Sequence, residues 1–275
     1  MKHEDVETIR ALVHARSGVL IDPEKTYQIE TGLAPVARRA GFASLSDLVQ
    51  AIRAQRDERL LWAATEALTS SETSFFRDRI PFQAFREEIL PALVAKRGDK
   101  PIRIWCAACG TGQEPYSLAM IIDDEQAKLG EARIELFGSD ISERALERAQ
   151  RGLYTQFEVQ RGLPIRLLVR HFEKVDDQWG LSPRIRQMVR WRRINLLADL
   201  RALGRFDVIL CRNVVSSFDE ATRPRVLNQL ANALEDDGWL MLGADETVGG
   251  VTDRLKPIPG RRGFYALGQE AHAAA

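Results

Sequence analysis

The stretch from residue 102 to residue 120 constrains the fold more than any other part of the sequence. A short apolar strand at its start is followed by very small residues, Ala107 to Gly112, and then by a helix that begins near Glu114 and Pro115. Small residues directly after a buried strand let the backbone approach another group closely. Free N–H groups in the first turn of a helix attract an anionic group such as a carboxylate or phosphate. The stretch therefore predicts a strand–turn–helix unit that binds a nucleotide-type cofactor.

After this unit the sequence continues to alternate apolar strands with amphipathic helices. Further strands are expected at residues 133–138, 206–211, 238–243 and 262–267, and further helices at 142–150 and 219–234. The last strand is expected to run antiparallel to its neighbour, and residues 236–238 are expected to form a turn. Such alternation favours an α/β fold with a Rossmann-like, doubly wound sheet that carries helices on both faces.

The chain before this region is organised differently. Residues 1–68 carry apolar side chains at helical spacing and no strand pattern. This predicts a small bundle of four helices, and residues 44–47 offer N-cap candidates for the third of them. Residues 69–98 are expected to form a linker and a helix that border the cofactor. Residues 99–275 are expected to form the α/β domain.

One segment inside the α/β domain breaks the alternation. Residues 153–193 separate the second helix from the next loop of the sheet, and about 40 residues are too many for a plain connection. Their pattern predicts a small inserted antiparallel β-subdomain, with strands near residues 178–182 and 188–194.

Charge and composition limit the class of protein. The 275 residues contain 39 lysines and arginines against 39 aspartates and glutamates, so the overall charge gives no argument for a nucleic-acid partner. No run of about 18 apolar residues predicts a membrane span, and the polar start from Met1 to Asp5 does not resemble a signal peptide. Three cysteines form no disulfide framework. We therefore expect a cytoplasmic protein that does not insert directly into a membrane.

The N-terminal helices have a basic character that comes from Arg38, Arg39, Arg53, Arg56 and Arg59. Charged residues at this density usually form a solvated surface, and two acidic residues lie nearby in the sequence. The alternative is a docking surface for an acidic helical partner. The sequence leaves both interpretations open.

Polar or small residues mark the ends of the expected strands at Gly110, Gly112, Asp140, Asn195 and Asn213. Ligands of a doubly wound sheet bind outside the carboxyl ends of its strands. Asp140 can accept hydrogen bonds from both ribose hydroxyls, although an acid at a helix start is the alternative. Asn195 and Asn213 can offer amide donors and acceptors to an adenine edge. Their alternative role is that of loop asparagines in left-handed turns.

Glu114 discriminates between two nucleotide cofactors. A Rossmann fingerprint of three spaced glycines seats a pyrophosphate at the start of the helix, but residues 109–115 lack the third glycine. A glutamate at this position would repel a pyrophosphate and attract the charged amino group of a methionine moiety. The charge therefore favours S-adenosylmethionine over NAD.

Cys106 and Cys109 have the spacing of a thioredoxin-like redox pair. In such a pair the helix begins directly after the motif and lowers the pKa of the thiol. Here glycines intervene, and the series of strands and helices is much longer than a thioredoxin domain. We favour two small side chains packed beside the cofactor over a redox centre.

The segment before the first expected strand is rich in hydroxyl groups. Five serines and threonines surround Glu72 between residues 69 and 74, and two phenylalanines and Arg77 follow. One interpretation is a cap for the helix expected at residues 79–97. The other is a polar lip that hydrogen-bonds to a ligand, with Arg77 as a fixed cation for a carboxylate.

The chain as a whole, from about residue 6 to residue 267, resembles the CheR-type chemotaxis methyltransferases. These are S-adenosylmethionine-dependent protein-glutamate O-methyltransferases. The resemblance rests on segments in the family's order, at residues 71–77, 110–117, 139–141, 152–154, 195–197 and 206–214. It implies an N-terminal helical domain, a Rossmann-like methyltransferase domain and an inserted antiparallel β-subdomain. It implies no metal ion.

By the same resemblance, the cofactor would be contacted by Ser71, Thr73, Arg77, Glu114, Asp140, Asn195, Leu196, Asn213 and Val214. Arg77 is the residue expected to organise the acceptor carboxylate near the methyl donor. Three positions depart from the family pattern. Ser71 replaces the usual asparagine, Gln113 replaces a usual acid, and Ser217 replaces a common aromatic residue.

The implied reaction transfers a methyl group to a glutamate carboxylate and leaves S-adenosylhomocysteine. Glutamate is already ionised near neutral pH, so no general base is expected. The implied substrate is the cytoplasmic helical hairpin of a chemoreceptor, whose acidic surface could meet the basic N-terminal helices. The alternatives are a methyltransferase with another substrate, or a signalling scaffold that binds S-adenosylmethionine without turnover.

Overall fold

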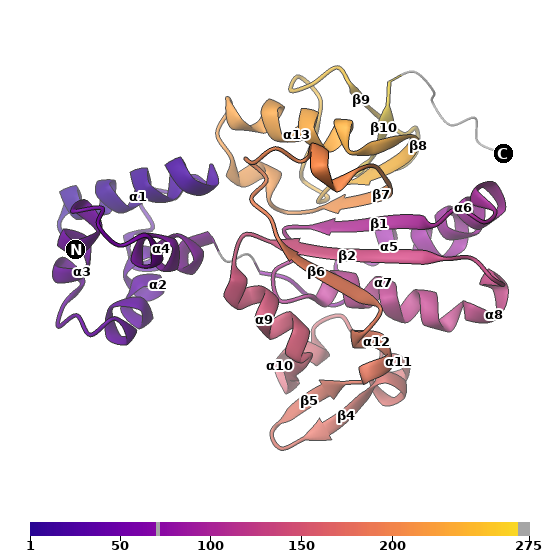
Figure 1. The fold of residues 1–275 in the computed structure, drawn as a ribbon, viewed down its shortest axis with the longest axis horizontal. Coiled ribbons are helices and arrows are strands. Elements are labelled where there is room, and N and C mark those ends of the chain that lie inside the picture. The colour runs from indigo at the N-terminus through magenta and orange to yellow at the C-terminus, as the bar shows by residue number, and fades with distance from the viewer. Residues whose placement is uncertain (70–71, 269–275) are drawn as a thin grey trace.

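The computed structural model describes residues 1–69 and 72–268. Four helices come first and form a bundle at the left of Figure 1: α1 (His3–Ser17), α2 (Thr26–Arg39), α3 (Leu45–Arg53) and α4 (Glu58–Thr69). Their apolar faces share one core, in which Ile9, Leu33 and Leu48 are fully buried. Among the N-cap candidates at residues 44–47, Ser44 caps α3, because its side chain accepts a hydrogen bond from Asp47 N at 3.1 Å and the Asp47 carboxylate accepts one from Ser44 N.

A long helical segment follows, in which α5 (Ile80–Ala84) and α6 (Leu90–Arg97) are joined by a single π turn, η1 (Phe85–Ile89). This segment matches the helix predicted at residues 79–97. The wider turn ends at Ile89, two residues before Pro91, whose ring would clash with the carbonyl four residues earlier in a regular α-helix. Throughout residues 1–69 and 72–268, every helix is too short or too polar to cross a membrane.

The α/β part is built on a seven-stranded sheet with the order β6-β2-β1-β7-β8-β10-β9. In chain order its strands are β1 (Ile102–Ala107), β2 (Ile134–Asp140), β6 (Val189–Arg193), β7 (Phe206–Cys211), β8 (Leu234–Met241), β9 (Leu255–Pro257) and β10 (Phe264–Leu267). The first five strands of the spatial order are parallel. β10 is antiparallel to both of its neighbours, as predicted.

Helices cover both faces of this sheet. The main ones are α7 (Gln113–Asp124), α8 (Gln126–Leu129), α9 (Glu143–Arg151) and α13 (Thr222–Asn232). Successive residues of β1 point to opposite faces, so Ile104 shares a core with Leu118 of α7, whereas Trp105 shares another with Leu230 of α13. The predicted Rossmann-like architecture is therefore confirmed, and Figure 1 shows its parallel strands between these helices.

One strand lies in a different sheet from the one expected. The strand predicted near residues 188–194 forms as β6, but it pairs with β2 at the edge of the main sheet instead of joining the inserted subdomain. Trp191 of β6 lies over Gly138 of β2, where an added Cβ would be 2.5 Å from the indole ring. The large apolar ring therefore fits the main sheet because Gly138 leaves room for it.

The turn predicted at residues 236–238 is also wrong, because these residues lie inside β8. The register between β7 and β8 shifts nearby, which accommodates the irregular segment. Asp237 is paired there with Arg97 at 2.6 Å and with Lys96 at 2.7 Å. These cations let an acidic pair, which usually favours a turn, remain within a strand.

The inserted segment forms a separate antiparallel sheet with the order β3-β5-β4, drawn below the main sheet in Figure 1. Its elements are β3 (Leu153–Thr155), α10 (Gln156–Gln160), α11 (Ile165–His171), β4 (Phe172–Val175), β5 (Gln178–Leu181) and α12 (Pro183–Arg186). The acidic end of α7 holds it in place. Asp124 contacts Arg166 at 2.7 Å and Arg170 at 2.8 Å, and Asp123 contacts Arg184 at 2.5 Å.

Candidate functional site

The strand order places the candidate site at the carboxyl ends of β1 and β7. β2 and β6 lie on one side of this pair and β8 on the other, so the chain order reverses between β1 and β7. Ligands of doubly wound sheets bind at such a switch point. The loop after β1 is tightly wound there, with Ala108, Gly110 and Gly112 at φ values of 51°, 56° and 92°.

Gly112 serves the packing of the protein itself. A Cβ at this position would lie 2.8 Å from the Cβ of Ala149 on α9 and 2.8 Å from the ring of Trp191 on β6. The glycine therefore lets α7 begin against α9 and β6. The sequence prediction that small residues here admit a cofactor does not explain Gly112, because protein atoms occupy the space.

Asp140 at the end of β2 holds two loops together. Its Oδ2 accepts a hydrogen bond from Gly110 N at 2.8 Å, and its Oδ1 accepts one from Ser142 N at 2.9 Å. Burial raises the pKa of the Asp140 carboxyl, and these backbone donors oppose the shift. Each carboxylate oxygen has a second lone pair, so Asp140 can still accept hydrogen bonds from ribose hydroxyls.

Glu114, in the first turn of α7, is buried against a cation. Its Oε1 accepts a hydrogen bond from Nη1 of Arg212, and Nη2 of Arg212 binds the carboxylate of Asp78. The Arg212 side chain is only 1% exposed. Oε2 of Glu114 accepts no hydrogen bond from the part of the chain that the structure describes. This oxygen is therefore available to the amino group of a methionine moiety.

Sequence analysis did not single out Arg212. The available signal is its place directly after β7, a strand of six residues that are all buried. A charged residue that continues such a strand must be paired, because an unpaired buried charge costs several kcal/mol. Its partners could not be read from the sequence, because Glu114 lies 98 positions away and Asp78 lies 134 positions away.

The lip segment brings Arg77 close to this pair. Nη1 of Arg77 donates a hydrogen bond to Glu72 O at 2.7 Å. Burial raises the pKa of Glu114, and the charge of Arg77 is one of those that oppose this rise. Arg77 forms no ion pair within the described residues. Thr73 is half-buried, and its hydroxyl makes no hydrogen bond there. Ser71, the other residue predicted on the lip, lies outside the described ranges.

The backbone of the lip is strained. Phe76, Asp78 and Arg79 all have positive φ angles, of 49°, 65° and 51°, and each such non-glycine residue costs roughly 1 to 3 kcal/mol. Phe76 N donates to Ser117 Oγ of α7 at 3.0 Å, which fixes the segment to the helix. No side chain caps α5, so the cap interpretation of this segment is wrong.

A pocket between the helical bundle and the sheet gathers four of the predicted cofactor residues. Asp140, Asn195, Leu196 and Val214 line it from the sheet side. Ser17, Val19 and Thr69 of the helical bundle complete its wall. The lining therefore combines a carboxylate with apolar side chains, as a ribose and a planar base require.

Asn195 also joins the two domains. Its Nδ2 donates to Arg16 O of α1 at 2.7 Å, and its Oδ1 accepts from Leu197 N at 3.0 Å. Much of the hydrogen-bonding capacity of Asn195 is thus used within the protein.

Ser217, where an aromatic residue is expected from the family resemblance, lies at the same junction. Its carbonyl accepts a hydrogen bond from Leu20 N at 2.8 Å.

Asn213 follows Arg212 and adopts a left-handed conformation with φ of 60°. Its Oδ1 is buried and has no hydrogen-bond partner among the described residues. A buried acceptor without a partner costs about 1 to 3 kcal/mol, which a ligand donor would recover. Together with the free oxygen of Glu114 and the apolar wall at Leu196, this unpaired acceptor fits S-adenosylmethionine.

The cysteines do not form a redox centre. Cys106, Cys109 and Cys211 are free and fully buried, and burial raises the pKa of each thiol well above its ordinary value. All three are therefore protonated near neutral pH. Nowhere in the described ranges do three or more histidine, cysteine, aspartate or glutamate side chains gather as a metal site.

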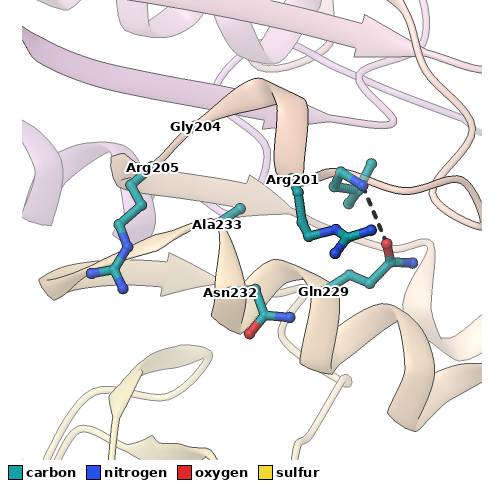
Figure 2. A pocket seen from close by; sticks show the side chains of 7 residues that line it. Arg201, Gly204, Arg205, Gln229, Asn232 and Ala233 are labelled. Carbon is teal, nitrogen blue, oxygen red and sulfur yellow. Dashed lines mark hydrogen bonds between the residues drawn. The ribbon is translucent and has the colours of Figure 1, made fainter.

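Another pocket lies at the opposite end of the strands. Figure 2 shows its lining, with Arg201 and Gly204 before β7 and Gln229 on α13, whose Oε1 accepts a hydrogen bond from Leu200 N at 3.3 Å. It contains none of the predicted site residues. Because it borders the amino ends of β7 and β8, it has no contact with the switch point.

The buried position of Glu114 predicts a pH dependence of cofactor binding. Burial raises the pKa of Glu114, and Arg212 opposes the shift only in part. Protonation on acidification removes the negative charge that attracts an amino group. Affinity for S-adenosylhomocysteine, measured by calorimetry, should therefore fall at a higher pH than the ordinary glutamate pKa of about 4.3 would imply. Glu114→Gln should bind more weakly and lose this dependence, and an equal pH dependence in both proteins would contradict the assignment.

Comparison with known proteins agrees with this geometry. Residues 4–69 match the family model described as CheR methyltransferase, all-alpha domain, and residues 71–264 match CheR methyltransferase, SAM binding domain. The chain is 35% identical to chemotaxis protein methyltransferase 1 of Pseudomonas aeruginosa over 258 residues. The matched region covers 92% of this chain and 94% of that relative.

Two further relatives give the same result. Identity to chemotaxis protein methyltransferase Cher2 of Pseudomonas putida is 33%, with the same coverage. Identity to the chemotaxis protein methyltransferase of Vibrio parahaemolyticus is 35% over 249 residues, which is 90% of each chain. The chain belongs to the CheR methyltransferase family and is a methyltransferase with S-adenosylmethionine as its cofactor.

Proposed function

We propose that this protein is a protein-glutamate O-methyltransferase that modifies the cytoplasmic domain of a chemoreceptor. The single observation that carries the proposal is Arg77, a cation near Glu114 that has no carboxylate partner among the described residues. A guanidinium is well suited to bind a carboxylate in a fixed orientation. The printed names of the relatives, chemotaxis protein methyltransferases, support the same substrate class.

In this proposal, residues at the ends of different strands contact different parts of the cofactor. Glu114 holds the amino group, Asp140 holds the ribose, and Leu196 and Val214 pack against the adenine. Asn213 hydrogen-bonds to the edge of the base. The remaining contacts come from Ser71, Thr73, Arg77 and Asn195, whose amide nitrogen has a second hydrogen beyond the one given to Arg16.

When bound, S-adenosylmethionine would supply a methyl group carried on a positively charged sulfur. A carboxylate oxygen of the substrate would attack the methyl carbon, and the sulfur would leave, which gives a methyl ester and S-adenosylhomocysteine. The side chains of the protein act by position. Arg77 orients the acceptor carboxylate, which needs no general base because glutamate is ionised near neutral pH. The lip excludes water and keeps the reacting atoms about 3 to 3.5 Å apart.

The receptor surface in this proposal is acidic, and the exposed arginines of the helical bundle would attract it. Arg53 is partly used within the bundle, because it contacts Glu4 at 3.0 Å and Asp5 at 3.1 Å. Arg56 and Arg59 are exposed and form no ion pair among the described residues. These two arginines are therefore better test positions than Arg53.

Reversing both charges in Arg56→Glu/Arg59→Glu should lower kcat/KM for a receptor cytoplasmic fragment by about tenfold at low salt, because long-range attraction is lost. The difference should shrink as salt screens the charges, and the affinity for S-adenosylhomocysteine should not change. Lys100→Glu/Arg133→Glu is a matched control at the far ends of β1 and β2. Equal loss in both double variants, or no loss in either, would contradict docking through the bundle.

Production of S-adenosylhomocysteine tests the proposed activity itself. We expect its formation to depend on the receptor fragment, and to fall when the acceptor glutamates are replaced by glutamine. A scaffold without turnover would bind the cofactor and release no product in either case. Release that is independent of the fragment would point to another substrate. The reaction is placed in the cytoplasm by the same proposal, because the acceptor lies in the cytoplasmic part of the receptor.

A further inference from the structure

Glu246 lies on the loop that follows β8 and is hydrogen-bonded to Asn213 of the candidate site. It is buried, and its carboxylate accepts three backbone hydrogen bonds. Oε2 accepts from Gly243 N at 2.7 Å and from Asn213 N at 2.8 Å, and Oε1 accepts from Ser216 N at 3.0 Å. One side chain thus holds the loop after β7 against the loop after β8.

This junction is closely packed. A Cβ at Gly243 would lie 2.7 Å from Nδ2 of Asn213 and 2.9 Å from Oε2 of Glu246. The backbone of Glu246 is fixed from the other side, because its carbonyl accepts a hydrogen bond from the hydroxyl of Tyr265 at 3.1 Å. Glu246 therefore cannot shift without disturbing the backbone at Asn213.

Asn213 needs this support. Its left-handed backbone, with φ of 60°, is a conformation that asparagine adopts more readily than most residues but still at some cost. The hydrogen bond from its own N–H to Glu246 opposes relaxation to an ordinary conformation. The result is a buried Oδ1 acceptor with no partner in the part of the chain that the structure describes.

We infer that Glu246 is a positioning residue that fixes Asn213 to recognise the amino group of adenine. The inference rests on the proposed function, in which Asn213 contacts the base. Adenine carries an amino donor that Oδ1 can accept, whereas unsubstituted purine carries only hydrogen at the same position. A site built to receive a donor rejects the analogue that lacks it, because its acceptor is left buried and unpaired.

The test compares S-adenosylhomocysteine with its purine analogue, in which hydrogen replaces the 6-amino group and nothing else changes, by calorimetry. The wild-type protein should prefer the adenine compound by about tenfold or more, which corresponds to one buried hydrogen bond. In Glu246→Gln the amide NH2 faces at least one backbone N–H donor, so the loop loses its fixed position. The preference should fall to about threefold or less, because the hydrogen bond to the amino group is weakened or lost.

Glu246→Ala should reduce the preference at least as far. Asp245→Asn is the matched control, because Asp245 is the neighbouring carboxylate and its side chain is 93% exposed. This control should retain the wild-type preference. Thermal unfolding identifies which variants are folded, and Glu246→Gln decides the result if Glu246→Ala does not fold.

Asn213→Ala separates this inference from the proposed function. Loss of the preference in Asn213→Ala and Glu246→Gln, but not in Asp245→Asn, supports the inference. Loss in Asn213→Ala alone overturns it and leaves the adenine contact standing. A preference that survives in Asn213→Ala removes the contact and the inference together. Equal weakening of both ligands in the Glu246 variants also overturns it, because a merely structural role has that effect.

Discussion

Arg77→Ala is expected to lower the rate of methyl transfer to a receptor fragment by about 100-fold or more, with the protein still folded. Arg77 is half-exposed, and within the described residues its side chain makes only one hydrogen bond, to Glu72 O, so its loss removes little from the fold. The reaction depends on holding the acceptor carboxylate in line with the methyl donor, and misplacement by about 1 Å can cost about 100-fold. Transfer of a labelled methyl group, measured under saturating cofactor, gives the rate.

The matched control for this prediction is Arg79→Ala. Arg79 lies two residues along the same strained segment, is exposed, and forms no ion pair among the described residues. The variant Arg79→Ala should retain most of the methyl-transfer activity. Binding of S-adenosylhomocysteine to Arg77→Ala should weaken much less than turnover. Turnover of Arg77→Ala close to that of the wild type, or an equal loss in Arg79→Ala, would remove Arg77 from its proposed role.

Arg212→Met is expected to have the largest effect on stability. The substitution leaves Glu114 buried without its cation, and breaking a buried ion pair from one side costs about 3 to 5 kcal/mol in the free energy of unfolding. Glu114 would respond by taking up a proton, since burial already raises its pKa. The uncharged form no longer attracts an amino group, so cofactor affinity should fall as well. Denaturant unfolding and calorimetry measure the two effects.

A second substitution separates stability from binding. Arg212→Met/Glu114→Gln contains no unpaired charge at Glu114, so it should regain part of the lost free energy of unfolding. It should not regain cofactor affinity, because the carboxylate is absent. Asp78, the other partner of Arg212, has a side chain that is 41% exposed, and water can hydrate it. The account of this pair is contradicted if Arg212→Met alone unfolds like the wild type, or if the double variant recovers cofactor binding.

Local features of this fold could be predicted from the sequence. The alternation of strands and helices after residue 102 gave the doubly wound sheet, because the pattern depends on periods within short segments. Residues 44–47 were recognisable as the start of α3, because the cap that forms there joins Ser44 to Asp47, only three residues away. Asp140 could be placed at the end of its strand for the same local reason.

Features that depend on distant residues could not be predicted. Arg212 joins Glu114 to Asp78 across the whole site, and no short pattern reveals that pairing. The place of β6 depends on Trp191 covering Gly138, which is a fact of packing between two strands. The positive φ angles of Phe76, Asp78 and Arg79 are held by tertiary contacts, because these residue types would not choose them locally.

Site-resolved mass spectrometry of a receptor cytoplasmic fragment tests the central claim most directly. The fragment is incubated with the wild-type protein and S-adenosylmethionine, with Arg77→Ala as the comparison, and is then digested before and after mild alkali. The account predicts methyl groups on glutamate side chains, strongly reduced with Arg77→Ala and removed by alkali as esters are. Methyl groups on another type of residue, alkali-stable methyl groups, or an unmodified fragment from a protein that binds the cofactor would contradict it.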